Sequence, residues 1–97
     1  MGGLALDEAY LKRQLTSVGR RVFVEYFREF ANEALSNQDV ADVLPYEYTL
    51  KSRLSRTSHA RSIIRQGLTR DALTMISESE AVDAPTRDAA RTLLAEV

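Results

Sequence analysis

Hydrophobic residues recur along this chain at the spacing of helices rather than strands. Apolar positions three, four or seven residues apart dominate, and no stretch alternates apolar and polar residues as a half-buried strand does. The first stripe consists of Leu4, Leu11, Leu15 and Val18, and Gly19 is well placed to end that helix. The pattern therefore predicts an all-α fold.

Residues 20–34 form the most apolar segment and hold the three phenylalanines of the chain. The inward positions of the helix expected there are Val22, Phe23, Tyr26, Phe27, Phe30, Ala31 and Ala34. Burial of one phenylalanine ring contributes about 1.5–3 kcal/mol, and the opposite positions are charged, as on a solvated face. We expect this segment to be the central helix of the core.

The next helix is predicted by its boundaries. Ser36 is a favourable N-cap, and Asp39 three residues later completes an acidic capping box. Val40 and Ala41 supply an apolar face, and Pro45 ends the helix. A short capped helix is therefore expected before a tight turn.

A basic helix follows the turn, with Thr49 as its N-cap and with Leu50 and Leu54 turned inward. Extending the same register would place Arg61 on the buried side. We therefore expect a bend near residues 57–58, after which the isoleucines can face the core.

The remaining helices are delimited by glycine, threonine and proline. Gly67 is typical of a helix C-terminus, Thr69 opens a further helix, and Pro85 fits the first turn of the last one. We expect one helical domain over residues 1–97, a small bundle of five to six helices. A helix-turn-helix would lie at about residues 36–57, and the C-terminal helices within residues 69–97.

Charge is distributed unevenly along the chain. Residues 48–70 contain six basic residues and no acid, whereas residues 1–47 hold five basic and eight acidic side chains, and residues 71–97 hold two and six. The net charge of −1 thus conceals a basic segment between acidic flanks. Its basic residues are Lys51, Arg53, Arg56, Arg61, Arg65 and Arg70. Such asymmetry lets one face attract polyanions.

Residues 36–57 have the layout of a helix-turn-helix. Ala41 is small enough for the crossing of the two helices, and the second helix would present polar side chains to a major groove about 12 Å wide. With its leucines inward, that helix would point Lys51, Ser52, Ser55 and Arg56 outward, with Arg53 on the flank.

Residues 35–56 resemble the DNA-binding helix-turn-helix of bacterial sigma-factor region four and of related response-regulator domains. The match is densest at residues 35–37 (Leu-Ser-Asn), 39–41 (Asp-Val-Ala), Leu44 and residues 49–56 (Thr-Leu-Lys-Ser-Arg-Leu-Ser-Arg). In that family the second helix reads promoter DNA. The resemblance implies a transcriptional regulator or accessory factor that contacts double-stranded DNA. The implied contact residues are Thr49, Lys51, Ser52, Arg53 and Arg56, and Arg61 and Arg65 are backbone-contact candidates.

Several alternatives remain open at this point. The arginines could pair with acids of the flanks, such as Glu47, Asp71, Glu78 and Glu80, in surface ion pairs worth about 0–1 kcal/mol each. The basic face could dock an acidic protein, which would make the chain a helical protein–protein interaction module. RNA attracts the same charge as DNA, and the last helices could instead form a homodimer.

Composition argues against catalysis and membrane insertion. The chain has no cysteine, one histidine and no glycine-rich phosphate loop, so we expect no enzyme, no metal site, no cofactor and no small-molecule substrate. His59 is expected to be a surface residue. No apolar run approaches the roughly 20 residues of a membrane span, and the N-terminus lacks a basic signal-peptide region. A cytoplasmic location is therefore expected.

Overall fold

The computed structural model describes residues 2–97, with side chains from residue 8 onward, so Leu4 of the first predicted stripe lies outside the described side chains. Every regular element in this part of the chain is a helix, as the periodicity predicts. The helices are α1 (Gly2–Val18), α2 (Arg20–Glu25), α3 (Phe27–Ala31), α4 (Asn37–Val43), α5 (Leu50–Arg65), α6 (Thr69–Ser77) and α7 (Ala84–Glu96).

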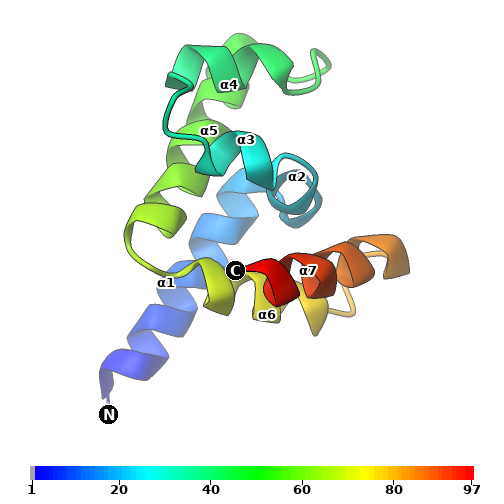
Figure 1. Cartoon of the computed structure of the whole chain (residues 1–97). Helices are drawn as coiled ribbons and strands as arrows, with labels where there is room; N and C mark the ends of the chain where they lie inside the picture. Colours follow the sequence, from blue (N-terminus) through cyan, green and yellow to red (C-terminus); the bar gives the residue numbers. More distant parts are fainter. Residues whose placement is uncertain (1) are drawn as a thin grey trace.

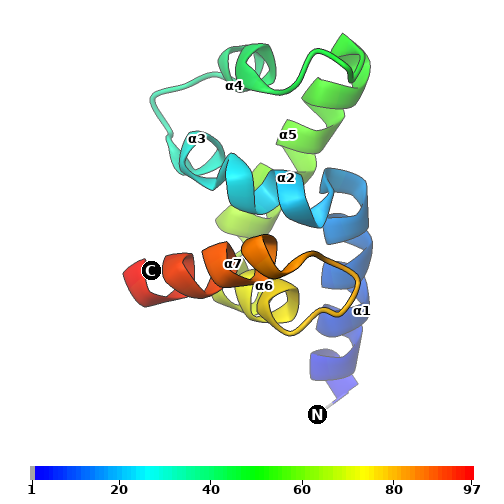
Figure 2. The same cartoon turned by 90° about the vertical axis from the view of Figure 1, so that its right-hand side faces the viewer.

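Helix α5 connects the two ends of the molecule (Figures 1 and 2). Its first turns pack against α4, its length lies along α1, and its C-terminal end leads into the pair formed by α6 and α7. Helix α2 reaches α7, and α3 packs on α5. The domain measures 38 × 28 × 23 Å along its principal axes.

The core forms around the phenylalanines of residues 20–34. The Phe23 ring is fully buried, with its centroid 5.7 Å from that of Phe27 and 6.3 Å from that of Phe30. The expected single helix is wrong, because the chain breaks at Tyr26 into α2 and α3. The break turns Val24 inward as well as the rings, and one straight helix face is too narrow to bury all of them. Within residues 2–97, this division also raises the number of helices from the expected five or six to seven.

The predicted bend in the basic helix is also wrong. Helix α5 runs uninterrupted from Leu50 to Arg65. Both Arg61, at 7% exposure, and the fully buried Ile63 face neighbouring helices, because α5 has α1 along one side and α3 and α4 along another. A helix with two packed sides needs no bend to bury both residues.

The helix boundaries predicted at Ser36, Gly19, Gly67 and Pro85 are confirmed. The Ser36 hydroxyl accepts from the Asp39 amide and the Asp39 carboxylate accepts from the Ser36 amide, both at 3.0 Å. Gly19 and Gly67 end their helices at φ angles of 92° and 75°. Pro85 lies in the first turn of α7. No helix in the described part of the chain is both long and apolar enough to cross a membrane.

Candidate nucleic-acid interface

The seven predicted contact residues lie on α5 and its N-cap, but the structure divides them between two environments. Thr49 and Lys51 are exposed at the start of the helix, and Arg65 is exposed at its end. The Thr49 hydroxyl accepts from the Ser52 amide at 3.1 Å, which confirms the predicted cap. The arginines between these ends have main-chain partners on other helices.

Arg53 joins α5 to α4 and to the turn between them. Its Nη1 donates to the Ala41 carbonyl at 2.9 Å, and its Nε donates to the Tyr48 carbonyl at 3.1 Å. The guanidinium carbon also lies 4.4 Å from the centre of the Tyr46 ring. Arg53 therefore fixes the turn that leads into α5.

Arg56 joins α5 to the end of α1. Its Nη1 donates to the Val18 carbonyl at 2.7 Å, its Nε donates to the Ser52 hydroxyl at 3.1 Å, and its guanidinium lies 3.9 Å from the centre of the Tyr48 ring. A Cβ at Gly19 would lie 3.0 Å from this Nη1. Arg56 is thus half-buried against α1, rather than pointing outward as expected.

Arg61 is the most constrained of the three. Its Nε donates to the Phe30 carbonyl at 3.1 Å and its Nη2 to the Asn32 carbonyl at 2.9 Å. Its Nη1 donates to Oδ1 of Asn37 at 2.8 Å. With 7% of its surface exposed, the side chain has no free donor face to offer a phosphate, so the expected backbone contact from Arg61 does not fit the structure.

These three arginines share one role, because each binds carbonyls at the C-terminal end of another helix. Val18 ends α1, Ala41 lies in the last turn of α4, and Phe30 lies in the last turn of α3. Carbonyls in the last turn of a helix lack an intrahelical partner and carry the negative end of the helix dipole. A guanidinium group donates hydrogen bonds to these carbonyls and places a positive charge at the negative end of the dipole. It also carries several N–H donors in a fixed planar fork.

Other arginines repeat the arrangement in the C-terminal half. Arg70 donates to the Leu94 and Val97 carbonyls at the end of α7, and Arg91 donates to the Ser77 carbonyl at the end of α6. The alternative in which the basic segment pairs with acids of the flanks is not seen among the side chains of residues 8–97. Within residues 8–97, the ion pairs are Arg21–Glu25, Arg28–Glu96 and Arg91–Asp88.

What remains on the solvent side of α5 is a polar stripe, which we call the outer face. Four of its five residues are exposed and Ser62 is half-buried. The spacing alternates between four and three residues, so the side chains share one side of the helix. The outer face consists of Lys51, Ser55, Ser58, Ser62 and Arg65. It carries two cations and no acid.

Helix α1 borders the outer face along one edge. His59 Nδ1 lies 2.7 Å from Oε1 of Gln14, and Gln66 donates to the Tyr10 hydroxyl at 2.7 Å. The hydrogen bond from Gln66 lowers the pKa of Tyr10, and the charge of Arg13 contributes in the same direction. Arg13 is exposed on α1 three positions after Tyr10, and it adds a third cation beside this edge.

The N-terminal end of α5, at the turn that follows α4, is apolar at its surface rather than polar. Three large apolar side chains are exposed there, Val43 at 50%, Tyr46 at 74% and Leu50 at 46%. The expectation that Leu50 faces inward is wrong, because the first turn of α5 extends past the core and leaves this side chain in solvent. We call these three residues the tip. Glu47, also exposed, lies in the same turn.

His59 has an amide partner from Gln14, and no group of three or more His, Asp or Glu side chains suited to a metal occurs among the described residues. Comparison with protein-family models, with curated proteins and with solved structures gives no match to this chain.

Proposed function

We propose that this protein binds duplex DNA through the outer face of α5, as a small helix-turn-helix transcriptional regulator or accessory factor. The observation that carries the proposal is the exposed, acid-free stripe on α5, which has Lys51 near one end and Arg65 at the other. The succession of α4, a tight turn and α5 supports it, as does the resemblance of residues 35–56 to sigma-factor region four.

The dimensions of the outer face suit a groove. Lys51 and Arg65 are fourteen positions apart, about 21 Å along the helix axis, and a major groove is about 12 Å wide. The two cations can therefore reach phosphates on opposite rims while the helix lies between them. The three serines are short, so they allow close approach and offer hydroxyls to phosphates or base edges.

The predicted contact residues have two different roles in this proposal: some contact DNA, and the others hold α5 in place. Thr49 and Ser52 lie at the N-terminal end, which helix-turn-helix proteins place nearest the bases, and Lys51 and Arg65 contact phosphates. Arg53 and Arg56 hold α5 against α4 and α1, and so orient the outer face. Arg61 acts inside the protein only.

The test measures the affinity for a labelled random 20-base-pair duplex by fluorescence anisotropy across a series of salt concentrations. Each lost phosphate contact should reduce the slope of log affinity against log salt by about 0.9. We expect a loss of about one unit for Lys51→Ala and about two for the double variant with Arg65→Ala. Lys12→Ala is the matched control, because Lys12 is exposed on α1 outside the outer face.

Two results would refute the proposal. One is the absence of duplex binding at low salt by the folded wild-type protein. The other is an equal change of slope for Lys51→Ala and Lys12→Ala. Parallel titrations with single-stranded DNA and with duplex RNA identify the nucleic acid. If RNA binds more strongly than duplex DNA, RNA is the ligand.

A second function, docking of an acidic protein, is favoured by the exposed tip of Val43, Tyr46 and Leu50 beside Lys51. An apolar patch rimmed by charge is typical of protein interfaces. The double variant Tyr46→Ser and Leu50→Ser discriminates between the two functions. A DNA reader should keep its salt slope in this variant, whereas a protein-docking module should lose binding of an acidic helical peptide that the wild type binds.

A further inference from the structure

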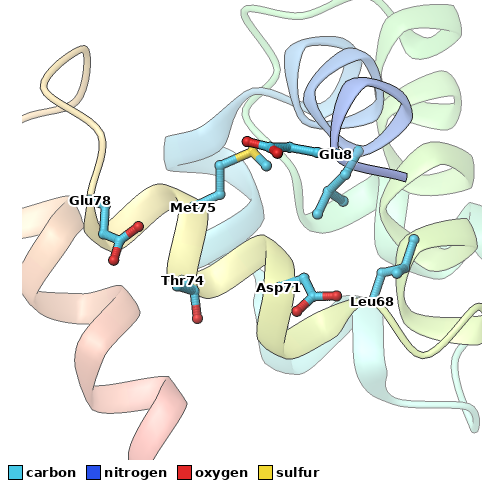
Figure 3. A pocket seen from close by; sticks show the side chains of 7 residues that line it. Glu8, Leu68, Asp71, Thr74, Met75 and Glu78 are labelled. Carbon is cyan, nitrogen blue, oxygen red and sulfur yellow. The ribbon is translucent and has the colours of Figure 1, made fainter. Parts of the chain in front are cut away.

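A groove of about 300 Å³ lies between α1 and α6, away from the outer face of α5 (Figure 3). On α1, Tyr10 and Gln14 contact α5, whereas Glu8 and Leu11 line this groove. The other lining residues are Leu68, Asp71, Thr74, Met75 and Glu78. Asp71, Thr74 and Met75 of α6 and its C-cap Glu78 follow the i, i+3, i+4, i+7 spacing of a single helix face, about 10 Å long.

The groove combines an apolar floor with an acidic rim. Leu11 is buried, and Leu68 and Met75 are half-buried, so the floor is formed by side chains that already pack on the core. The rim carries three exposed carboxylates, those of Glu8, Asp71 and Glu78. None of these has an ion-pair or hydrogen-bond partner among the described side chains, and no basic residue lines the groove.

We propose that this groove docks a basic amphipathic helix of a partner protein. An apolar side chain of the partner would lie on Leu11 and Met75, and its flanking lysines or arginines would reach the three carboxylates. The two-turn length of the lining face matches the helix-in-groove mode, in which anchors recur at i, i+3, i+4 and i+7. The flexible thioether of Met75 can adapt to different apolar anchors.

Charge decides which occupant the groove accepts. Three carboxylates around an apolar floor repel nucleic acid and acidic proteins, and they favour a cationic partner by electrostatic complementarity. The protein would therefore carry two surfaces of opposite preference, with α1 between them. A partner helix in the groove leaves the outer face of α5 uncovered, so binding at the two surfaces is compatible.

The test uses a labelled 14-residue peptide of leucine and lysine with helical spacing, LKKLLKLLKKLLKL, and the 97-residue protein at 0.15 M salt. The variant Glu8→Gln, Asp71→Asn, Glu78→Gln should weaken binding at least tenfold. The control removes three exposed carboxylates from other sites: Glu33→Gln, Asp42→Asn and Glu80→Gln. It should weaken binding less than twofold. Both variants change only exposed side chains, and matched thermal unfolding curves would verify that both fold.

Met75 separates docking from mere charge attraction. Met75→Ser should weaken the peptide at least threefold and Met75→Leu should retain the affinity, while the amide NMR shifts caused by the peptide map to α1 and α6. Equal weakening by the two triple variants, no effect of Met75→Ser, shifts centred elsewhere, or no binding below 1 mM peptide would each overturn the proposal. So would sedimentation showing a wild-type dimer that the groove variant dissociates, because the occupant would then be a second copy.

Discussion

The replacement of Arg61 by alanine tests whether an arginine of the basic segment stabilises the fold rather than binding a ligand. The guanidinium supplies three hydrogen bonds to the ends of α3 and α4 and is almost completely buried. Its removal leaves the buried Phe30 carbonyl without a partner, which costs about 1–3 kcal/mol. Loss of the packed aliphatic stem adds about 1 kcal/mol. Asn32 and Asn37 are exposed, so water can replace their bonds.

We therefore expect Arg61→Ala to lower the free energy of unfolding by about 2–4 kcal/mol, a large share of the 5–15 kcal/mol typical of a domain. In a chain of 97 residues this corresponds to a fall in Tm of about 10–25 °C. Urea titration followed by circular dichroism measures the change, and an unchanged m-value verifies that the unfolded states are comparable.

Arg65→Ala is the matched control, because Arg65 lies one turn further along α5 and is exposed. A surface change of this kind stays within about 0.5 kcal/mol. Arg61→Lys keeps the charge but cannot direct three donors in a fork, so it should fall between the two. A loss below about 1 kcal/mol for Arg61→Ala would refute the reasoning, since the carbonyls would then have satisfactory partners without the guanidinium.

Three further outcomes follow from the same geometry. Gly19→Ala should cost more stability than Gly67→Ala in urea titrations. Both glycines adopt positive φ, which an L side chain disfavours, but Gly19 has a ψ of 122°, outside the left-handed helical region, and its new Cβ would lie 3.0 Å from Nη1 of Arg56; an equal loss would contradict this. The Asp39 carboxylate accepts from the Ser36 amide, which lowers the pKa of Asp39, so its contribution to stability is present above the unfolded pKa of about 3.9 and is lost as pH falls through the lower folded pKa. Asp39→Asn should therefore flatten the pH dependence of Tm between pH 5 and 2, and a pH profile equal to that of the wild type would refute this prediction. Ser36→Ala should lower stability by about 1 kcal/mol by thermal unfolding at pH 7, and no change would show that the capping box is not formed in solution.

Local chemistry in the sequence was sufficient for the helical character of the chain and for several helix ends, but not for the break at Tyr26 or for the straight course of α5. Hydrophobic spacing predicts helices, and the residues that end them act through their own backbone or a neighbour three positions away, as Ser36, Thr49 and the two positive-φ glycines do. These interactions need no knowledge of the tertiary structure. The sequence alone also gives the acid-free composition of residues 48–70. It predicts the exposure of Lys51 and Arg65 as well, because a charged residue opposite an apolar stripe faces solvent.

Only the tertiary structure decided which cations are free. Arg53, Arg56 and Arg61 bind carbonyls that lie 12, 38 and 31 positions away in the chain, and a carbonyl is present in every residue, so nothing in the sequence marks these acceptors. For the same reason the bend near residues 57–58 was predicted where none exists: a buried arginine looks unfavourable until its three acceptors are known. The groove between α1 and α6 likewise depends on the approach of Glu8 to Asp71 and Glu78, which are remote in sequence.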